Sequence, residues 1–109
     1  MEAEKLNQLQ TILSNGTRMV FFGGAGVSTE SGIPDFRSPD GLYHMKYDVP
    51  PEQLLSHSYF YSHTKQFYQF YREKMICLTA KPNGAHRKLA ELERAGKLSA
   101  IVTQNIDGL

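Results

Sequence analysis

The sequence predicts an α/β fold with a parallel sheet, to which two strands of this chain contribute. A short apolar run at 19–22 ends in glycine, and a second apolar run at 98–103 ends in a polar loop. The chain between them carries apolar residues at helical spacing. A crossover between parallel strands needs only about a dozen residues, far fewer than this connection contains. We therefore expect part of the connection to form a smaller helical lobe beside the sheet.

Composition is that of a globular protein and excludes several functions. Of 109 residues, 40% are hydrophobic, 21% charged and 11% aromatic, and the formal net charge is +1. This balance predicts no nucleic-acid partner, and no apolar run approaches the roughly 18 residues of a membrane span. The first residues do not resemble a signal peptide. Cys77 is the only cysteine, so we expect no internal disulfide, no cysteine-based zinc site and a reducing, cytoplasmic setting.

The first predicted element is an amphipathic helix over residues 3–14. Its apolar side chains recur three and four positions apart: Leu6, Leu9, Ile12 and Leu13. Gly16 is suited to the left-handed position that ends a helix. The run at 19–22 is too short for a helix and predicts a strand covered on both faces, as in parallel sheets.

The middle of the chain divides into a loop and a helical region. Residues 23–45 are rich in glycine and proline, which predicts an ordered loop with one short helical turn, and long loops in compact domains are usually functional. Pro51 is well placed as a first helical residue. Residues 52–77 are crowded with aromatic side chains, and Phe60, Phe67 and Tyr71 recur at helical spacing. We interpret them as a packed helical core.

The last third of the chain predicts one more helix and one more strand. Asn83 is a good N-cap, and Gly96 is a good C-terminal stop. Ala85, Leu89 and Leu92 mark the apolar stripe between them. The strand at 98–103 follows and runs into a polar loop. If the two strands are parallel neighbours, both loops emerge at the carboxyl edge of the sheet, where open α/β folds bind ligands.

The glycines that follow the first strand are typical of a phosphate-binding loop. Glycines at that position let the backbone approach a pyrophosphate, whose charge is then met by amide N–H groups. The third position of a dinucleotide-binding fingerprint is Thr29 rather than glycine, so a simple tight turn stays open as an alternative. No Walker loop is present. Ser28 is not in a nucleophile elbow, because Glu30 stands where that motif needs glycine.

Three separated blocks carry a more specific pattern. Residues 24–37 read Gly-Ala-Gly-Val-Ser-Thr-Glu-Ser-Gly-Ile-Pro-Asp-Phe-Arg, with Asp-Gly-Leu-Tyr at 40–43. Lys-Pro-Asn-Gly-Ala-His occupies 81–86, and Thr-Gln-Asn-Ile-Asp-Gly-Leu occupies 103–109. In order and spacing these blocks resemble the sirtuins, the NAD-dependent protein-lysine deacylases, and specifically the bacterial type. The resemblance covers nearly the whole chain.

The resemblance implies a division of the chain. Residues 1–45 and 83–109 are expected to form part of a Rossmann-like parallel sheet that binds NAD. Residues 46–82 are expected to form part of a helical small lobe inserted into it. On this interpretation the chain is the N-terminal fragment of a sirtuin domain, incomplete at its C-terminus, and zinc is expected only in the missing C-terminal part.

The resemblance also implies roles for residues of the two loops. Gly24, Ala25 and Gly26 would lie under the dinucleotide phosphates, with Thr29 close by and Arg37 supplying positive charge. Phe36 would cover the nicotinamide ribose, and Gln104 would hydrogen-bond that ribose. Asn105, Ile106 and Asp107 would line the nicotinamide pocket. Asp35 belongs to the same cofactor-binding set, although an ion pair with Arg37 that holds the loop together is an alternative for both residues.

Sirtuin chemistry implies that the complete protein removes acyl groups from protein lysines and releases nicotinamide and O-acyl-ADP-ribose. The general-base histidine of the family follows the Gln-Asn-Ile-Asp block, so this chain alone is expected to lack turnover. None of its four histidines is expected to substitute; His86 is interpreted as structural and His44 as part of the cofactor loop. Two alternatives stay open: a non-catalytic module that binds NAD or ADP-ribose, and a sirtuin-like domain that hydrolyses NAD.

The aromatic region bears on the acyl group. Sirtuins that prefer acidic acyl chains carry Tyr-x-x-Arg there, whereas this chain has Tyr68-Gln69-Phe70-Tyr71, with Arg72 one place late. We therefore expect a neutral group such as acetyl, carried by a protein or peptide substrate.

Overall fold

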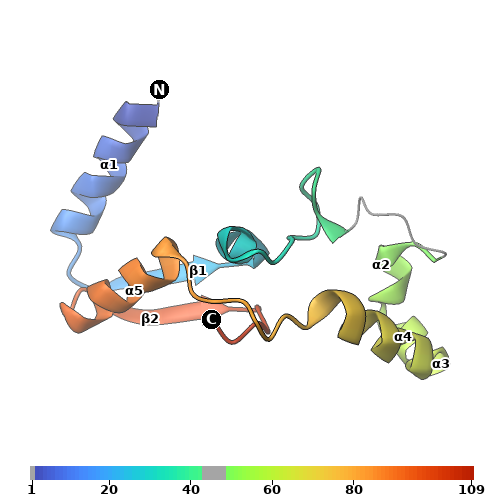
Figure 1. Cartoon of the computed structure of the whole chain (residues 1–109). Helices are drawn as coiled ribbons and strands as arrows, with labels where there is room; N and C mark the ends of the chain where they lie inside the picture. The colour runs from blue at the N-terminus through green and yellow to red at the C-terminus, as the bar shows by residue number, and fades with distance from the viewer. Residues whose placement is uncertain (1, 43–48) are drawn as a thin grey trace.

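A computed structural model describes residues 2–42 and 49–109 of the chain. In chain order its elements are α1 (Glu2–Asn15), β1 (Met19–Gly23), the 3₁₀ helix η1 (Ala25–Ser31), α2 (Pro51–Leu54), α3 (His57–Ser62), α4 (Thr64–Phe70), the π-helix η3 (Tyr71–Met75), α5 (Gly84–Arg94) and β2 (Leu98–Thr103). Figure 1 shows the strands beside α5, while α2, α3 and α4 gather at the other end of the molecule. The predicted α/β fold is confirmed.

The two strands pair in parallel, so the condition on which both loops share one edge of the sheet is met. Met19 lies opposite Leu98 and Gly23 opposite Thr103, with a register shift after Met19. Alternate side chains of a strand point to opposite faces of the sheet, and Phe21 lines a cavity with Leu89 of α5. The expectation that β1 is covered on both faces is wrong. Val20 and Phe22 are 62% and 75% exposed, because α5 packs on one face only and the described chain leaves the other open.

The predicted N-terminal helix is confirmed as α1, which projects away from the sheet (Figure 1). Its apolar face is exposed at Leu6, Leu9 and Ile12. At its C-terminal end the Lys97 Nζ donates hydrogen bonds to two carbonyl oxygens of α1, those of Leu13 at 3.2 Å and Ser14 at 3.0 Å. These bonds attach α1 to the residue that precedes β2.

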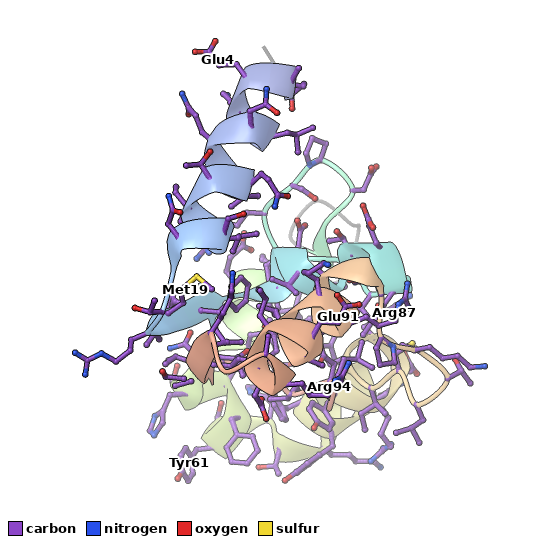
Figure 2. The ribbon with its side chains drawn as sticks, turned by 90° about the vertical axis from the view of Figure 1, so that its left-hand side faces the viewer. Glu4, Met19, Tyr61, Arg87, Glu91 and Arg94 are labelled. Carbon is purple, nitrogen blue, oxygen red and sulfur yellow. The ribbon has the colours of Figure 1, made fainter. Side chains whose placement is uncertain are left out.

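Gly16 does not adopt the left-handed conformation expected of it. The glycines with positive φ in the described chain are Gly32, Gly96 and Gly108. Gly16 is closely packed instead: a Cβ there would require the flexible side chain of Met19 to move. Figure 2 shows Met19 at the base of α1, where the chain turns into β1. The amide of Gly16 still donates to the Ile12 carbonyl at 3.0 Å and closes the last turn.

The aromatic region folds as several short helices. Pro51 is the first residue of α2, as predicted. The core of the region is formed by Leu54, Tyr59 and Phe70, with Phe67 only partly buried against it. Phe60 and Tyr71 contact Phe67 through their rings, at centroid distances of 4.8 and 6.1 Å, yet they do not form the centre. The helices end and restart at residues 56 and 63, so one helical spacing does not describe one face.

Helix α5 begins and ends as predicted. The side chain of Asn83 caps its first turn, and Gly96 takes φ 76° just after it. On its exposed side, Lys88 Nζ bonds Glu91 Oε2 at 2.7 Å, and this hydrogen bond lowers the pKa of the Glu91 carboxyl. Figure 2 labels Glu91 and Arg94 on this helix.

Within the described residues no helix is long and apolar enough to cross a membrane. Tyr43 and His44, and the expected boundary between residues 45 and 46, lie outside the described residues.

Candidate functional site

Two loops that are far apart in the sequence meet at the carboxyl edge of the sheet. We call residues 23–42 the glycine loop and residues 104–109 the polar loop. The Asn105 Nδ2 donates to the Gly24 carbonyl at 2.9 Å. The Ser28 Oγ donates to the Asp107 Oδ2 at 2.5 Å, a length typical of a hydroxyl bound to a carboxylate. The expectation that both loops emerge together is confirmed.

The 3₁₀ helix η1 gives the glycine loop its shape. The Val27 amide donates to the Gly24 carbonyl at 3.1 Å, and Gly32, at φ 89°, ends the helix. Ser28 on this helix is 1% exposed. The Thr29 Oγ1 donates to the Gly26 carbonyl at 3.0 Å, so this side chain braces the loop from within.

A tight turn holds the second half of the glycine loop. The Asp35 Oδ1 accepts from the Ser38 amide at 3.2 Å and from the Ser38 Oγ at 2.5 Å. The Leu42 amide closes the turn on the Asp35 carbonyl at 2.7 Å. Gly41 is packed against this turn: a Cβ there would lie 2.8 Å from backbone atoms of both Asp35 and Phe36. Asp35 therefore holds the turn that contains Phe36 and Arg37.

A cavity of about 530 Å³ lies between the two loops. Its lining comprises Gly24, Ala25, Gly26, Asp35, Phe36, Arg37, Ser38, Gln104 and Asn105. A Cβ built on Gly24 or Gly26 would meet no atom within 4 Å, so the backbone here is open to a ligand. Open backbone after a strand, with a guanidinium nearby, suits the phosphates of a dinucleotide.

A second cavity of about 130 Å³ adjoins the first and shares Ala25, Phe36, Gln104 and Asn105 with it. The polar residues of its remaining lining are Ser28, Asp107 and Lys74 of η3. The others are apolar: Ile33, Pro34, Leu42, Met75 and Ile106. The Asp107 carboxylate is held at both oxygens, by Ser28 and by the Leu109 amide at 2.9 Å. This arrangement suits a flat, mostly apolar ring with a polar substituent.

The two cavities together contain ten of the eleven residues expected to bind the cofactor. The exception is Thr29, whose hydroxyl bonds inside the loop and whose side chain lies at a neighbouring hollow with Asp35 and Asp40. The fold brings these residues together around two adjoining cavities. The role of each residue toward a cofactor stays a prediction.

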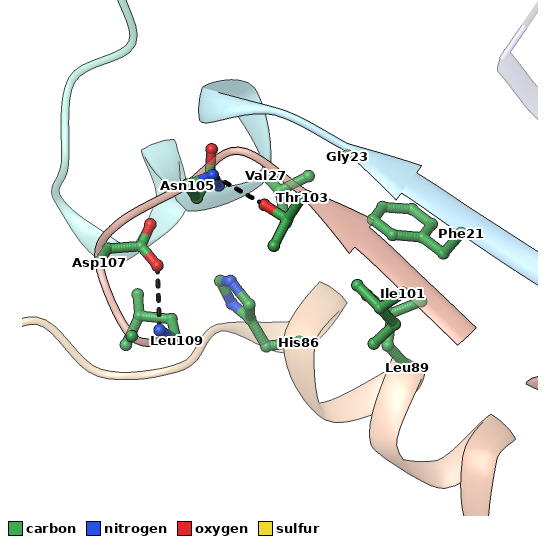
Figure 3. Close-up of a pocket in the computed structure, with 11 residues that line it drawn as sticks. Phe21, Gly23, Val27, His86, Leu89, Ile101, Thr103, Asn105, Asp107 and Leu109 are labelled. Atoms are coloured by element: carbon green, nitrogen blue, oxygen red, sulfur yellow. Dashed lines mark hydrogen bonds between the residues drawn. The ribbon is translucent and has the colours of Figure 1, made fainter. Parts of the chain in front are cut away.

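A third cavity, of about 190 Å³, lies behind the polar loop and is lined by His86, Phe21 and Leu89 among others. Figure 3 shows the His86 ring extending from α5 toward the polar loop. Its Nδ1 accepts a hydrogen bond from the backbone N–H of Asn83 at 3.1 Å, as part of the N-terminal cap of α5. The interpretation of His86 as structural agrees with that contact.

Two residues that matter to the site were not among the expected set. Ser28 lies within the first sequence block, and only its burial and its bond to Asp107 reveal a role. Asn83 was predicted only as a helix cap, but its side-chain amide also donates a hydrogen bond to the Val27 carbonyl of the glycine loop. Both contacts join residues more than fifty positions apart, which no local pattern reports. In the described ranges, no three His, Cys, Asp or Glu side chains are grouped to hold a metal ion.

Comparison with known proteins gives consistent matches. The profile of the Sir2 family matches residues 24–109. An NAD-dependent protein deacetylase of Clostridium acetobutylicum is 60% identical over 108 residues, which cover 97% of this chain and 44% of that protein. The chain therefore spans less than half the length of the curated relatives it matches.

Solved structures agree with these matches. A Sir2 protein with a deacetylated p53 peptide and 3'-O-acetyl ADP ribose superposes with a TM-score of 0.80 at 44% identity, covering 94% of this chain and 40% of that one. A complex of Sir2 with a p53 peptide and NAD⁺ gives a TM-score of 0.75 at 41% identity, covering 94% and 39%.

Proposed function

The chain belongs to the Sir2 family, and from that premise we propose that the full-length protein carrying it is an NAD-dependent protein deacetylase. It would transfer the acetyl group of a protein lysine to the ADP-ribose part of NAD, with release of nicotinamide. The 60% identity to a curated deacetylase supports the reaction. The observation that carries the proposal is the meeting of the two loops around adjoining cavities that suit a phosphate pair and a flat ring.

In this proposal the larger cavity binds the phosphates and ribose. The open space at Gly24 and Gly26 would let the backbone amides of residues 24–26 approach the phosphates, and Arg37 would add positive charge. Gln104 bonds the ribose next to nicotinamide. Thr29 supports the binding backbone through its bond to Gly26.

The smaller cavity would hold the nicotinamide. Asp107 would accept from the carboxamide, and its two hydrogen-bond donors fix the carboxylate for this task. Asn105 and Ile106 would line the ring, and Phe36, which borders both cavities, would keep water from the reacting ribose carbon. When bound, NAD would supply that carbon as the electrophile for the acyl oxygen of the substrate, with nicotinamide as the leaving group.

The substrate class and the setting of the protein are part of the same proposal. Tyr71 occupies the position at which Tyr-x-x-Arg would place an arginine, which supports a neutral acyl group such as acetyl. Residues 1–45 and 83–109 would form the NAD-binding part, and 46–82 the helical part. The single cysteine supports a reducing, cytoplasmic location.

The test is a stoichiometric assay of the full-length protein with NAD and an acetyl-lysine peptide. Deacetylated peptide and nicotinamide should appear in equal amounts. The Asp107→Asn variant should lower kcat/KM for NAD by about tenfold to a hundredfold, because a charged hydrogen-bond partner is lost. Ser62→Ala, which removes an exposed hydroxyl of the helical region, should leave kcat/KM unchanged.

Two other results would replace the proposal. Nicotinamide release that does not depend on the peptide would indicate NAD hydrolysis. NAD binding in a titration without any turnover would indicate a non-catalytic binding module.

A further inference from the structure

Asn83 lies outside the two cavities of the site, between the first turn of α5 and the glycine loop, and it is 9% exposed. The oxygen and the nitrogen of its side-chain amide bond different parts of the chain. The Oδ1 accepts from the amides of Ala85 at 2.9 Å and His86 at 3.5 Å. The Nδ2 donates to the Val27 carbonyl at 2.7 Å and to the Ser31 Oγ at 3.1 Å. Both donors and the acceptor oxygen of the amide are thus engaged.

Capping α5 does not by itself require asparagine. Serine and aspartate cap helices about as well, because capping needs only an acceptor oxygen. An aspartate carboxylate cannot donate, and a serine hydroxyl has a single donor on a shorter side chain. The two bonds to the glycine loop therefore give the amide a role that the cap does not explain.

These bonds act on η1 at a particular place. The Val27 carbonyl belongs to the peptide unit that leads into Ser28, and Ser28 bonds Asp107 from the polar loop. The 3₁₀ helix is thus held by the α5 N-terminus through Asn83 and by the polar loop through Ser28. Gly24, Ala25 and Gly26, which line the larger cavity, lie directly before or within this clamped segment.

We infer that Asn83 is a positioning residue for the dinucleotide site: through Val27 it sets where η1 presents its backbone to the cofactor. The inference rests on the proposed function of that site. A displacement of the order of 1 Å remote from the reacting atoms can cost as much as a hundredfold in rate. The hydrogen bonds of Asn83 to the glycine loop can therefore affect the reaction even though Asn83 lines neither cavity of the site.

A series of substitutions at Asn83 in the full-length protein separates this role from capping. Asn83→Asp and Asn83→Ser keep a cap and lose the hydrogen bond to the Val27 carbonyl, whereas Asn83→Ala loses both. All three should raise KM for NAD by about tenfold, as expected for a lost buried hydrogen bond, with a smaller change in kcat. Tm should fall in all three variants through the lost buried hydrogen bond, and it should fall furthest in Asn83→Ala, which also loses the cap.

The matched control is Ser56→Ala, which removes the N-cap of α3 in the helical region. It should lower Tm without changing KM for NAD. The inference is overturned if Asn83→Asp and Asn83→Ser keep KM for NAD within twofold of the unmodified protein. It is also overturned if Ser56→Ala raises KM for NAD in proportion to its loss of Tm, since that would make the effect one of general stability.

A second readout does not depend on the reaction. Hydrogen exchange should accelerate at the amides of residues 27 and 33, which bond within the glycine loop, in Asn83→Asp and Asn83→Ser, while the amides of α5 stay protected. Unchanged exchange in the glycine loop would overturn the inference. If the unmodified protein showed no NAD-dependent deacetylation, the proposed function would fail, and this exchange experiment would still decide the role of Asn83.

Discussion

At the scale of the residue, two glycines of the same loop serve opposite purposes. Gly24 is extended, at φ −120°, and a Cβ there meets nothing within 4 Å. Gly41 is packed so closely that a Cβ would lie 2.6 Å from the Asp35 Oδ1 and 2.8 Å from backbone atoms. Residue type does not distinguish these two glycines, but one leaves room for a ligand and the other for its own chain.

The two alanine variants should therefore behave differently. In the full-length protein, Gly24→Ala should leave Tm within about 1 °C and raise the Kd for NAD by about tenfold or more, because the methyl group occupies ligand space. Gly41→Ala should lower Tm by about 4 °C or more, because backbone has to move. Thermal unfolding with and without NAD measures both. Equal losses of Tm in the two variants would contradict this assignment.

At the scale of the element, α1 depends on a contact from Lys97, the residue that precedes β2. Its apolar face is exposed, and the Lys97 ammonium bonds its last carbonyls. A cation at a helix C-terminus is worth about 0.3–1 kcal/mol. Lys97→Ala should accordingly reduce the free energy of unfolding of the full-length protein by about that amount and accelerate hydrogen exchange in residues 11–15.

Lys5→Ala is the matched control for this prediction, since Lys5 is an exposed lysine near the N-terminal end of the same helix. It should change neither the stability nor the exchange of the last turn. Equal effects from the two lysines would show that Lys97 acts through net charge rather than through its contacts with α1.

At the scale of the whole molecule, the chain is extended. Its accessible surface is 8276 Å², against about 6,100 Å² for a compact monomer of this mass, and its radius of gyration is 17.3 Å, against about 13 Å. Over residues 2–42 and 49–109 the sheet has two strands, and an independently stable sheet usually has three or more or packs against helices. Exposed apolar groups such as Val20, Phe22 and Leu78 contribute to the excess surface.

The 109-residue chain expressed by itself should therefore bind a hydrophobic dye such as ANS strongly and unfold over a broad temperature range. The full-length protein at the same concentration should bind little dye and unfold in a sharp transition. Fluorescence titration and scanning calorimetry measure the two properties. A sharp transition without dye binding by the 109-residue chain would refute the expectation.

The sequence predicted most of the local structure correctly because the signals are local. Apolar spacing identified α1, Asn83 and Gly96 set the ends of α5, and the apolar runs at 19–22 and 98–103 identified the strands. The aromatic region was harder. Spacing placed Phe60 and Tyr71 in a core whose centre proved to be Leu54, Tyr59 and Phe70. The region is divided into short helices, so a spacing counted across their ends does not mark one helix face.

By itself, the sequence determined the family, the presence of a parallel sheet and the two loops that form the site, since each depends on residue types at fixed positions along the chain. Only the tertiary structure decided how those loops are held together. Ser28 bonds Asp107, and Asn83 bonds Val27, between residues that approach only after the strands have paired. Hydrogen bonds of this kind require separations of a few ångströms in space, which cannot be predicted from the distance between two residues along the chain.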